Sequence, residues 1–136
     1  MSKDRPQCGL ILENTKGEIL LQLRDNKSAI PYPNTWGTFG GQIEKGETPK
    51  EAIIREIKEE LGYTLLDPEY LGVFPFDGYD IHMFRKVDNQ IKLRNLKVKE
   101  GQCGEFFSVG KLEGLRFAFN CESIVREYIK RFSNNN

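Results

Sequence analysis

The stretch from Gly40 to Tyr63, GGQIEKGETPKEAIIREIKEELGY, constrains the fold of this chain more than any other. Thr48 is a good N-cap, Pro49 suits the first helical position, and Glu51 follows Thr48 by three residues, as in a capping box. Gly62 supplies a natural helix stop. We therefore predict a helix that begins after Thr48 and ends before Gly62.

The predicted helix has two neighbouring faces of different chemistry. At about 100° per residue, one arc gathers the apolar side chains of Ile53, Ile54, Ile57 and Leu61. The next arc gathers Glu56, Glu59 and Glu60, whose carboxylates repel one another by about 0.2 to 0.5 kcal/mol per pair on an exposed helix. Hard oxygen ligands beside an apolar face favour a site for Mg²⁺, or for Mn²⁺. The alternative is a solvated acidic face.

The residues around these carboxylates complete a motif. The pattern G-x5-E-x7-R-E-U-x-E-E-x-G-U, with U a bulky apolar residue, is filled by Gly41, Glu47, Arg55, Glu56, Ile57, Glu59, Glu60, Gly62 and Tyr63. Only Tyr63 departs from the pattern, because an aliphatic residue is usual there. Through this motif the chain resembles the Nudix hydrolase family. The resemblance implies an α/β fold, the Nudix α/β/α sandwich, in which a mixed and mostly antiparallel sheet lies between helices.

The resemblance also implies a set of site residues. The segment KEGQCGEFFSVGKL is similar to a loop of MutT-type nucleoside triphosphate pyrophosphohydrolases, in which a glutamate joins the metal site when substrate is bound. Glu100 occupies that position. Metal contacts are implied from the Gly40 carbonyl and from Glu56, Glu59, Glu60 and Glu100. Members of the family differ in which glutamate acts as base, and we favour Glu56. Arg55 and Glu47 complete the implied catalytic set by holding the helix face in place.

The expected reaction is metal-dependent hydrolysis of a phosphoanhydride in a nucleoside diphosphate linked to another group, X. The leading interpretation is a MutT-like enzyme that converts a nucleoside triphosphate to a monophosphate and pyrophosphate. It is supported by residues at positions where MutT-type proteins contact the nucleotide, namely Arg24, Phe39 and Asn120. For Asn120 the alternative is a purely structural role as N-cap of the last helix.

Two other functions remain open. One is a different Nudix specificity, for a nucleotide sugar or a dinucleoside polyphosphate, because Tyr79 lies near the position where diadenosine polyphosphate hydrolases carry a tyrosine. The other is a non-catalytic nucleotide-binding sensor domain. The second is disfavoured, since every catalytic position of the motif is filled.

The composition limits which binding partners and which cellular location we expect. The 136 residues, 38% of them hydrophobic, suit a single Nudix domain over residues 1–136, with a disordered tail at 133–136. Basic and acidic residues balance at 20 each, so we expect a small nucleotide substrate and no nucleic-acid polymer. The start of the sequence lacks an apolar leader and no run has membrane-spanning length, which favours a cytoplasmic protein without a membrane partner. Either a monomer or a homodimer is expected.

Turn signals divide the rest of the chain. The runs 8–13 and 18–24 are predicted to form a hairpin, and so are 69–76 and 79–87, which meet at an Asp-Gly turn. The loop 25–35 is either a flap that faces the substrate or a plain surface connection. Residues 36–39 are predicted as a short strand that delivers the glycine pair, and residues 121–132 as a second amphipathic helix.

Three smaller features complete the expectations. Ser108 is predicted to cap a short helical turn at 109–112. His82 is interpreted as structural or as a ligand contact. The three cysteines, which are odd in number and widely spaced, are expected to be reduced thiols: Cys8, Cys103 and Cys121.

Overall fold

The computed structural model describes residues 6–132, so the tail predicted at 133–136 lies outside the described residues. A mixed sheet is formed by β1 (Gln7–Glu13), β2 (Ile19–Leu23), β3 (Trp36–Gly37), β4 (Phe39–Gln42), β5 (Glu69–Val73), β6 (Ile81–Val87) and β7 (Cys103–Phe107). Its main path runs β3-β2-β1-β6-β5, while β4 pairs with β1 and β7 pairs with β2. The helices are α1 (Pro49–Leu61) and α2 (Cys121–Phe132), with short 3₁₀ turns η2 (Leu93–Asn95) and η3 (Val109–Lys111).

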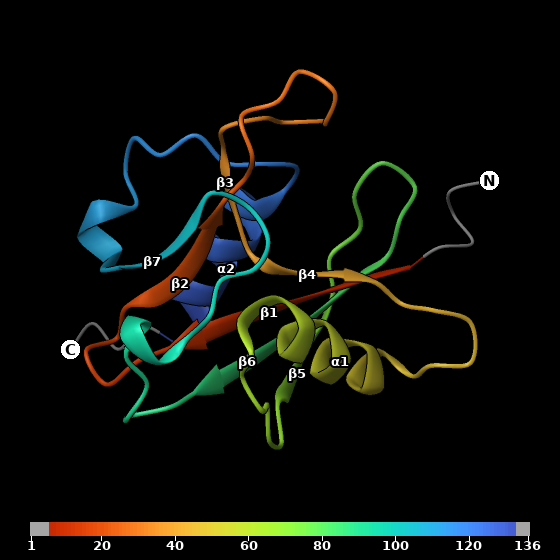
Figure 1. Ribbon diagram of the computed structural model, residues 1–136, viewed down its shortest axis with the longest axis horizontal. Coiled ribbons are helices and arrows are strands. Elements are labelled where there is room, and N and C mark those ends of the chain that lie inside the picture. The colour runs from red at the N-terminus through yellow and green to blue at the C-terminus, as the bar shows by residue number, and fades with distance from the viewer. Residues whose placement is uncertain (1–5, 133–136) are drawn as a thin grey trace.

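The two α-helices lie on opposite faces of the sheet, α1 in front and α2 behind in the view of Figure 1. Strand β1 alternates between them: Leu10 packs in the core under α1, whereas Ile11 packs in the core under α2. Strand β1 runs parallel to β6, and the other strand pairs are antiparallel. The expected α/β/α sandwich with a mixed, mostly antiparallel sheet is confirmed.

Helix α1 is set by the predicted local chemistry. The Glu51 amide donates to Thr48 Oγ1 over 3.1 Å, and the Thr48 amide donates to Glu51 Oε1 over 2.9 Å, which completes the capping box. At the other end Gly62 adopts a left-handed φ of 66° and donates its amide hydrogen to the carbonyl of Lys58. The apolar arc of the helix, with Ile53 and Ile57 fully buried, then packs on the sheet.

The strand that leads into the motif differs from the prediction. Residues 36–39 do not form one strand, because β3 pairs with β2 whereas β4 pairs with β1. The chain changes partner at Thr38, which lies between the two strands. Gly40 and Gly41 therefore lie inside β4, opposite Gly9 and Cys8 of β1, rather than in a loop after a strand.

Both predicted hairpins are confirmed. Glu13 pairs with Ile19 across the first turn. In the second, Phe76 and Tyr79 bridge across Asp77 and Gly78, whose φ angles of 53° and 84° are both positive, as in a type I′ turn.

Of the smaller expectations, the three cysteines are free, as predicted. The cap predicted for Ser108 is wrong, since within the described residues its side chain makes no capping hydrogen bond to η3. His82 Nδ1 lies 2.8 Å from the Tyr70 hydroxyl on the neighbouring strand.

Candidate functional site

Strand β4 meets α1 through its two glycines. A Cβ on Gly41 would lie 2.6 to 2.7 Å from the carboxyl atoms of Glu56, so this carboxylate rests directly on the bare backbone. A Cβ on Gly40 would lie 2.0 Å from the carbonyl oxygen of Cys8, which leaves room for glycine alone. The Gly40 amide donates to Glu60 Oε1 over 3.1 Å. The glycine pair thus brings α1 close enough for two of its carboxylates to reach the β4 backbone.

Arg55 joins the loop before α1 to the acidic face of the helix. Its Nε and Nη2 donate to the two carboxylate oxygens of Glu47, over 2.6 and 2.9 Å, and its Nη1 donates to Glu56 Oε2 over 3.0 Å. The Arg55 guanidinium, helped by the amide of Glu44, lowers the pKa of Glu47 to about 2. Glu47 is therefore ionised under ordinary conditions and keeps the guanidinium in one orientation.

Three carboxyl groups converge on the inner side of α1. Glu60 is only 5% exposed, and its carboxyl group is within hydrogen-bonding reach of Glu56 and of Glu100. Burial raises the pKa of Glu60 far above its ordinary range, and the two neighbouring carboxyl groups raise it further. Within residues 6–132 no group of three or more His, Cys, Asp or Glu side chains has the geometry to hold a metal ion. The chemistry of the donor set, three neighbouring carboxyl groups, nevertheless fits a hard divalent ion.

Glu100 reaches this cluster from a distant part of the sequence. The loop after η2 runs beside the end of α1, where the Lys99 amide donates to the carbonyl of Glu60 over 2.8 Å. Gln22 Nε2 holds the carbonyl of Glu100 over 3.0 Å, and Gly101 turns the chain with a φ of 84°. Strand β7 then pairs with β2 and fixes the loop.

Glu59 lies apart from the other predicted ligands. Its side chain is 59% exposed, and Oε1 lies 3.3 Å from Nη1 of Arg55. The structure thus brings together Glu56, Glu60 and Glu100, and leaves Glu59 at the rim of the site.

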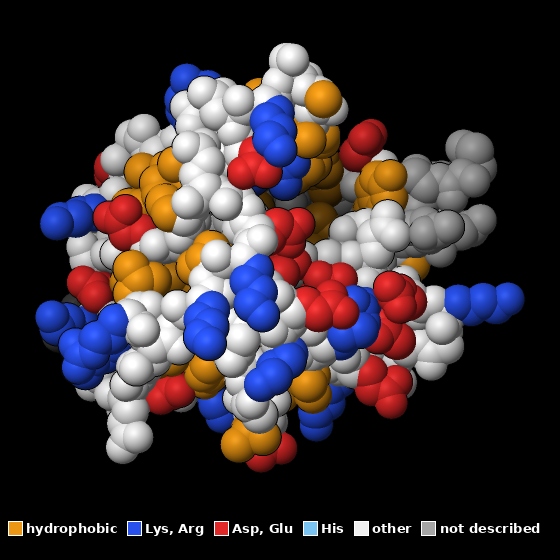
Figure 2. All heavy atoms as spheres, in the orientation of Figure 1, with side chains coloured by type: hydrophobic (Ala, Val, Ile, Leu, Met, Phe, Trp, Pro, Cys, Tyr) orange, Lys and Arg blue, Asp and Glu red, His pale blue; other side chains and the backbone are white. Residues whose placement is uncertain are grey.

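A pocket of about 400 Å³ adjoins the carboxylates. Figure 2 shows acidic side chains gathered on this face of the molecule, with a hollow beside them. Among the lining residues are five that the sequence predicted as metal or nucleotide contacts: Arg24, Gly40, Tyr79, Glu100 and Asn120. The expected contact from Phe39 is not supported, because this side chain is 2% exposed and packs in the core under α1.

Asn120 has an unsatisfied acceptor beside the pocket. Its Nδ2 lies 3.4 Å from the carbonyl oxygens of Phe74 and Pro75, which fixes the orientation of the amide. Its Oδ1 is buried and has no hydrogen-bond partner within the part of the chain that the structure describes. The alternative role as side-chain N-cap of α2 is wrong, because such a cap requires this oxygen to accept from the helix.

Sequence reasoning missed several residues that line the pocket. Phe119 and Thr38 are direct neighbours in sequence of predicted contacts, and Phe76 flanks the Asp-Gly turn. A closer look at aromatic residues beside turns and beside Asn120 would have singled out the two phenylalanines. His82 is not among the residues that line this pocket within 6–132.

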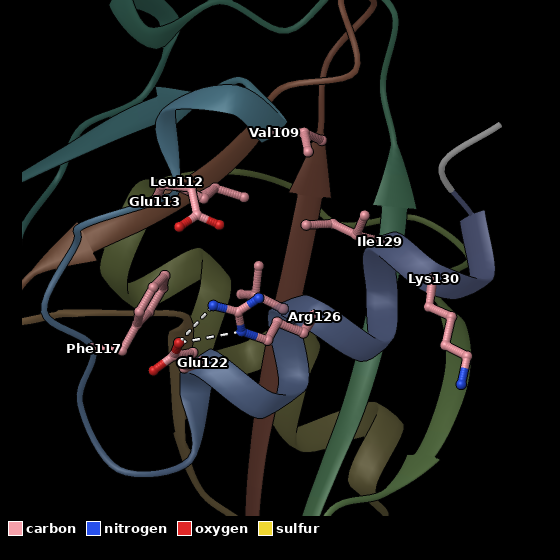
Figure 3. Close-up of a pocket in the computed structure, with 9 residues that line it drawn as sticks. Val109, Leu112, Glu113, Phe117, Glu122, Arg126, Ile129 and Lys130 are labelled. Carbon is pink, nitrogen blue, oxygen red and sulfur yellow. Dashed lines mark hydrogen bonds and ion pairs between the residues drawn. The ribbon is translucent and has the colours of Figure 1, made fainter. Parts of the chain in front are cut away.

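A second pocket, of about 250 Å³, lies between η3 and α2 (Figure 3). Phe117 and Ile129 line it, and Glu122 accepts hydrogen bonds from Arg126 beside it, the shorter 2.9 Å long. It contains no residue of the motif. We therefore place the candidate active site at the first pocket.

Comparison with known proteins assigns the family. The NUDIX domain profile matches residues 3–120. An uncharacterised Nudix hydrolase of Listeria innocua is 35% identical over 107 residues, which are 76% of this chain and 63% of the relative. An ADP-ribose pyrophosphatase of Methanocaldococcus jannaschii is 30% identical over 90% of this chain and 70% of its own length. An RNA pyrophosphohydrolase of a Marinomonas species is 39% identical over 51% of this chain and 37% of its own length.

The fold also has a solved counterpart. A solved structure of MutT, from work on the Aliivibrio salmonicida and Vibrio cholerae proteins, superposes with a TM-score of 0.78 and covers 94% of this chain and 98% of its own, at 24% identity. The chain belongs to the Nudix family. It spans less than two thirds of two of the three curated relatives above. In the described residues, no helix has the length and apolar character needed to cross a membrane.

Proposed function

We propose that this chain is a divalent-metal-dependent hydrolase that cleaves the phosphoanhydride of a nucleoside diphosphate linked to X. The leading substrate is a nucleoside triphosphate, with a monophosphate and pyrophosphate as products. One observation carries the proposal: Glu100, which joins Glu60 at the carboxylate cluster, and Asn120, with its free acceptor, line the same pocket. A cation site would bind the phosphates of a nucleotide, and Asn120 at the same pocket would contact its base.

The residues that would hold the cation are the Gly40 carbonyl and Glu56, Glu60 and Glu100, with Glu59 at the rim. Mg²⁺ is the expected ion, and Mn²⁺ prefers the same oxygen donors. When bound, it would neutralise phosphate oxygens and stabilise the leaving phosphate. This chemistry needs no covalent nucleophile from the protein.

The protein groups have separate roles in the proposal. The Glu56 carboxylate, fixed between Gly41 and Arg55, orients the attacking water and takes its proton. Arg55 holds Glu56, and Glu47 holds Arg55. Because each of these groups is held by the next, a small displacement along the chain of contacts misplaces the water.

Asn120 supports a nucleotide rather than a bare phosphate ester as substrate. With Nδ2 occupied by backbone carbonyls, Oδ1 is left to accept a hydrogen bond from the edge of a base. The N–H groups of a purine edge meet that requirement, and a ligand without a donor there leaves the oxygen unsatisfied. Arg24 and Tyr79 line the same pocket and are further candidate contacts.

A second substrate class is favoured by one comparison. The relative named ADP-ribose pyrophosphatase aligns with 90% of this chain, which supports a nucleoside diphosphate linked to a sugar as the alternative. The sensor function remains disfavoured, because the motif is complete and its carboxylates converge at a pocket.

The test is a substrate panel with Mg²⁺ in which each phosphate-containing product is identified by mass. The panel contains the common nucleoside triphosphates, 8-oxoguanine triphosphate, ADP-ribose, a second nucleotide sugar and a dinucleoside polyphosphate. Monophosphate plus pyrophosphate from a triphosphate supports the leading proposal. Preference for a sugar-linked diphosphate selects the alternative, and binding without turnover of any member selects the sensor.

A further inference from the structure

We propose that Phe119 is the platform on which the base of the substrate stacks, and that it makes the pocket selective for purines. The inference rests on the proposed function and adds a specificity-determining residue to it. Asn120 would accept a hydrogen bond from the edge of the base, and Phe119, its neighbour in sequence, would stack on the face of the base. Three features of the structure support this role.

The first feature is a group of aromatic rings at the mouth of the pocket. The ring of Phe119 lies 4.6 Å from that of Tyr32 and 6.0 Å from that of Phe76, centroid to centroid. Phe119 and Phe76 line the pocket. Phe119 is 38% exposed and Tyr32 is 42% exposed. The exposed part of the Phe119 ring offers the pocket flat apolar surface, which is what a nucleobase covers when it stacks.

The second feature is the backbone of Phe119. Its φ is 51°, in the left-handed region that bulky residues avoid. Its neighbours hold the chain there: Ala118 is buried and donates to the carbonyl of Trp36 over 2.8 Å, and the Asn120 carbonyl accepts from Ile124 over 3.1 Å. A strained residue held between fixed neighbours points to a functional requirement for its side chain.

The third feature is the anchoring of the facing loop. Arg24 places its guanidinium 5.1 Å from the centre of the Phe119 ring, and its Nη2 donates to the carbonyl of Pro31 over 2.8 Å. Gln102 Nε2 ties the same loop down, over 2.8 Å to the carbonyl of Arg24 and 2.9 Å to Oδ1 of Asn34. The loop 25–35 therefore holds Tyr32 against Phe119, while none of the residues 25–35 lines the pocket itself.

Together these contacts give a base two complementary surfaces from consecutive residues. The fixed amide of Asn120 presents an acceptor, and the ring of Phe119, backed by Arg24 and Tyr32, presents a face. A purine has the larger face and gains more from stacking than a pyrimidine does. We expect the loss of this face to weaken binding of purine nucleotides by roughly 5- to 150-fold.

The test is the substitution Phe119→Gly, which removes the ring and places at φ 51° a residue that adopts this conformation without strain. The relief of backbone strain offsets part of the loss of the ring contacts with Tyr32, Phe76 and Arg24, so the variant should fold, and its melting temperature is measured beside its kinetics. Phe119→Trp keeps an aromatic face and serves as the rescue. Tyr70→Leu is the matched control, because Tyr70 is a 51% exposed aromatic residue that contacts His82 and Phe84 rather than the pocket.

The measurement is kcat and KM for a purine and a pyrimidine nucleotide of the class that the wild type hydrolyses. In Phe119→Gly we expect KM for the purine to rise by roughly 5- to 150-fold with kcat within about threefold, and the purine preference to decrease to the part that Asn120 provides. Phe119→Trp should restore both, and Tyr70→Leu should leave both unchanged. An unchanged purine KM in a folded, active Phe119→Gly variant overturns the inference while the proposed function stands. Absence of nucleotide hydrolysis by the wild type defeats the proposed function, and this inference with it.

Discussion

The carboxyl carbon of Glu56 lies 2.6 Å from the point that a Cβ on Gly41 would occupy. Even the smallest side chain at this position must therefore displace the carboxylate that we assign as base. We predict that Gly41→Ala lowers kcat by about 100-fold, the cost of a misplacement of about 1 Å. Gly110→Ala is the control, since a Cβ there meets nothing within 4 Å. Equal kcat for the two variants would remove Glu56 from the catalytic step.

Asn120→Ala should change the choice of base rather than the stability of α2. The substitution removes an acceptor that has no partner in the described protein and two long Nδ2 contacts of 3.4 Å, but no helix cap. We expect kcat/KM ratios among guanine, adenine and 8-oxoguanine nucleotides to flatten, which corresponds to about 1 to 3 kcal/mol of discrimination. The melting temperature should stay close to that of the wild type. A lower melting temperature with unchanged ratios would restore the structural role.

Tyr63, the one departure from the motif, should make the stability of the fold depend on pH. Its hydroxyl donates to Asp88 Oδ2 over 2.7 Å, and this bond, with the Gln90 amide, lowers the pKa of Asp88 below its ordinary value of 3.8. A depressed folded-state pKa stabilises the fold above the unfolded value, and the benefit is lost as the pH falls through the folded value.

Tyr63→Phe should therefore be less stable than the wild type at about pH 7, and the difference should shrink at about pH 3. Urea denaturation at the two pH values measures it. A deficit that is the same at both pH values would contradict the linkage to Asp88.

Glu100→Gln should weaken metal binding in the presence of a nucleotide more than metal binding to the free protein. Glu100 is carried by a loop and meets Glu60 at the pocket, so it is placed to join the cation when a nucleotide is present. We expect Mn²⁺ affinity of the free protein to change little, and Mn²⁺ affinity in the presence of a non-hydrolysable nucleotide to fall at least about tenfold. Equal weakening in both conditions would show that Glu100 belongs to the metal site of the free protein.

Local chemistry made α1 predictable from the sequence. The capping box needs only Thr48 and Glu51, three residues apart, and the helix end needs only Gly62, so no distant contact decides either boundary. The Asp-Gly hairpin was predictable for the same reason.

Contacts between segments far apart in the sequence determine the parts of the site that local sequence patterns do not predict. Glu100 meets Glu60 because β7 pairs with β2, and residue spacing does not encode that choice of partner. Phe39 belongs to β4, which pairs with β1, whereas β3 pairs with β2. The Phe39 side chain is buried in the core. The orientation of Asn120 depends on two carbonyls of a hairpin far away in sequence. These contacts determine the pocket, which is why the sequence indicated Arg24, Tyr79 and Asn120 through a resemblance but did not indicate the phenylalanines beside them.

The central claim, a divalent cation held by the carboxylates of α1, is tested most directly by Mn²⁺ binding to the free protein, followed by electron paramagnetic resonance. Glu60→Gln removes the buried member of the cluster, and Glu122→Gln removes a carboxylate on α2 that pairs with Arg126 at the other pocket. We predict that Glu60→Gln weakens Mn²⁺ binding at least about tenfold, the lower range for loss of a group at a metal site. Glu122→Gln should bind as the wild type does. Equal Mn²⁺ affinity in the wild type and Glu60→Gln would contradict the account.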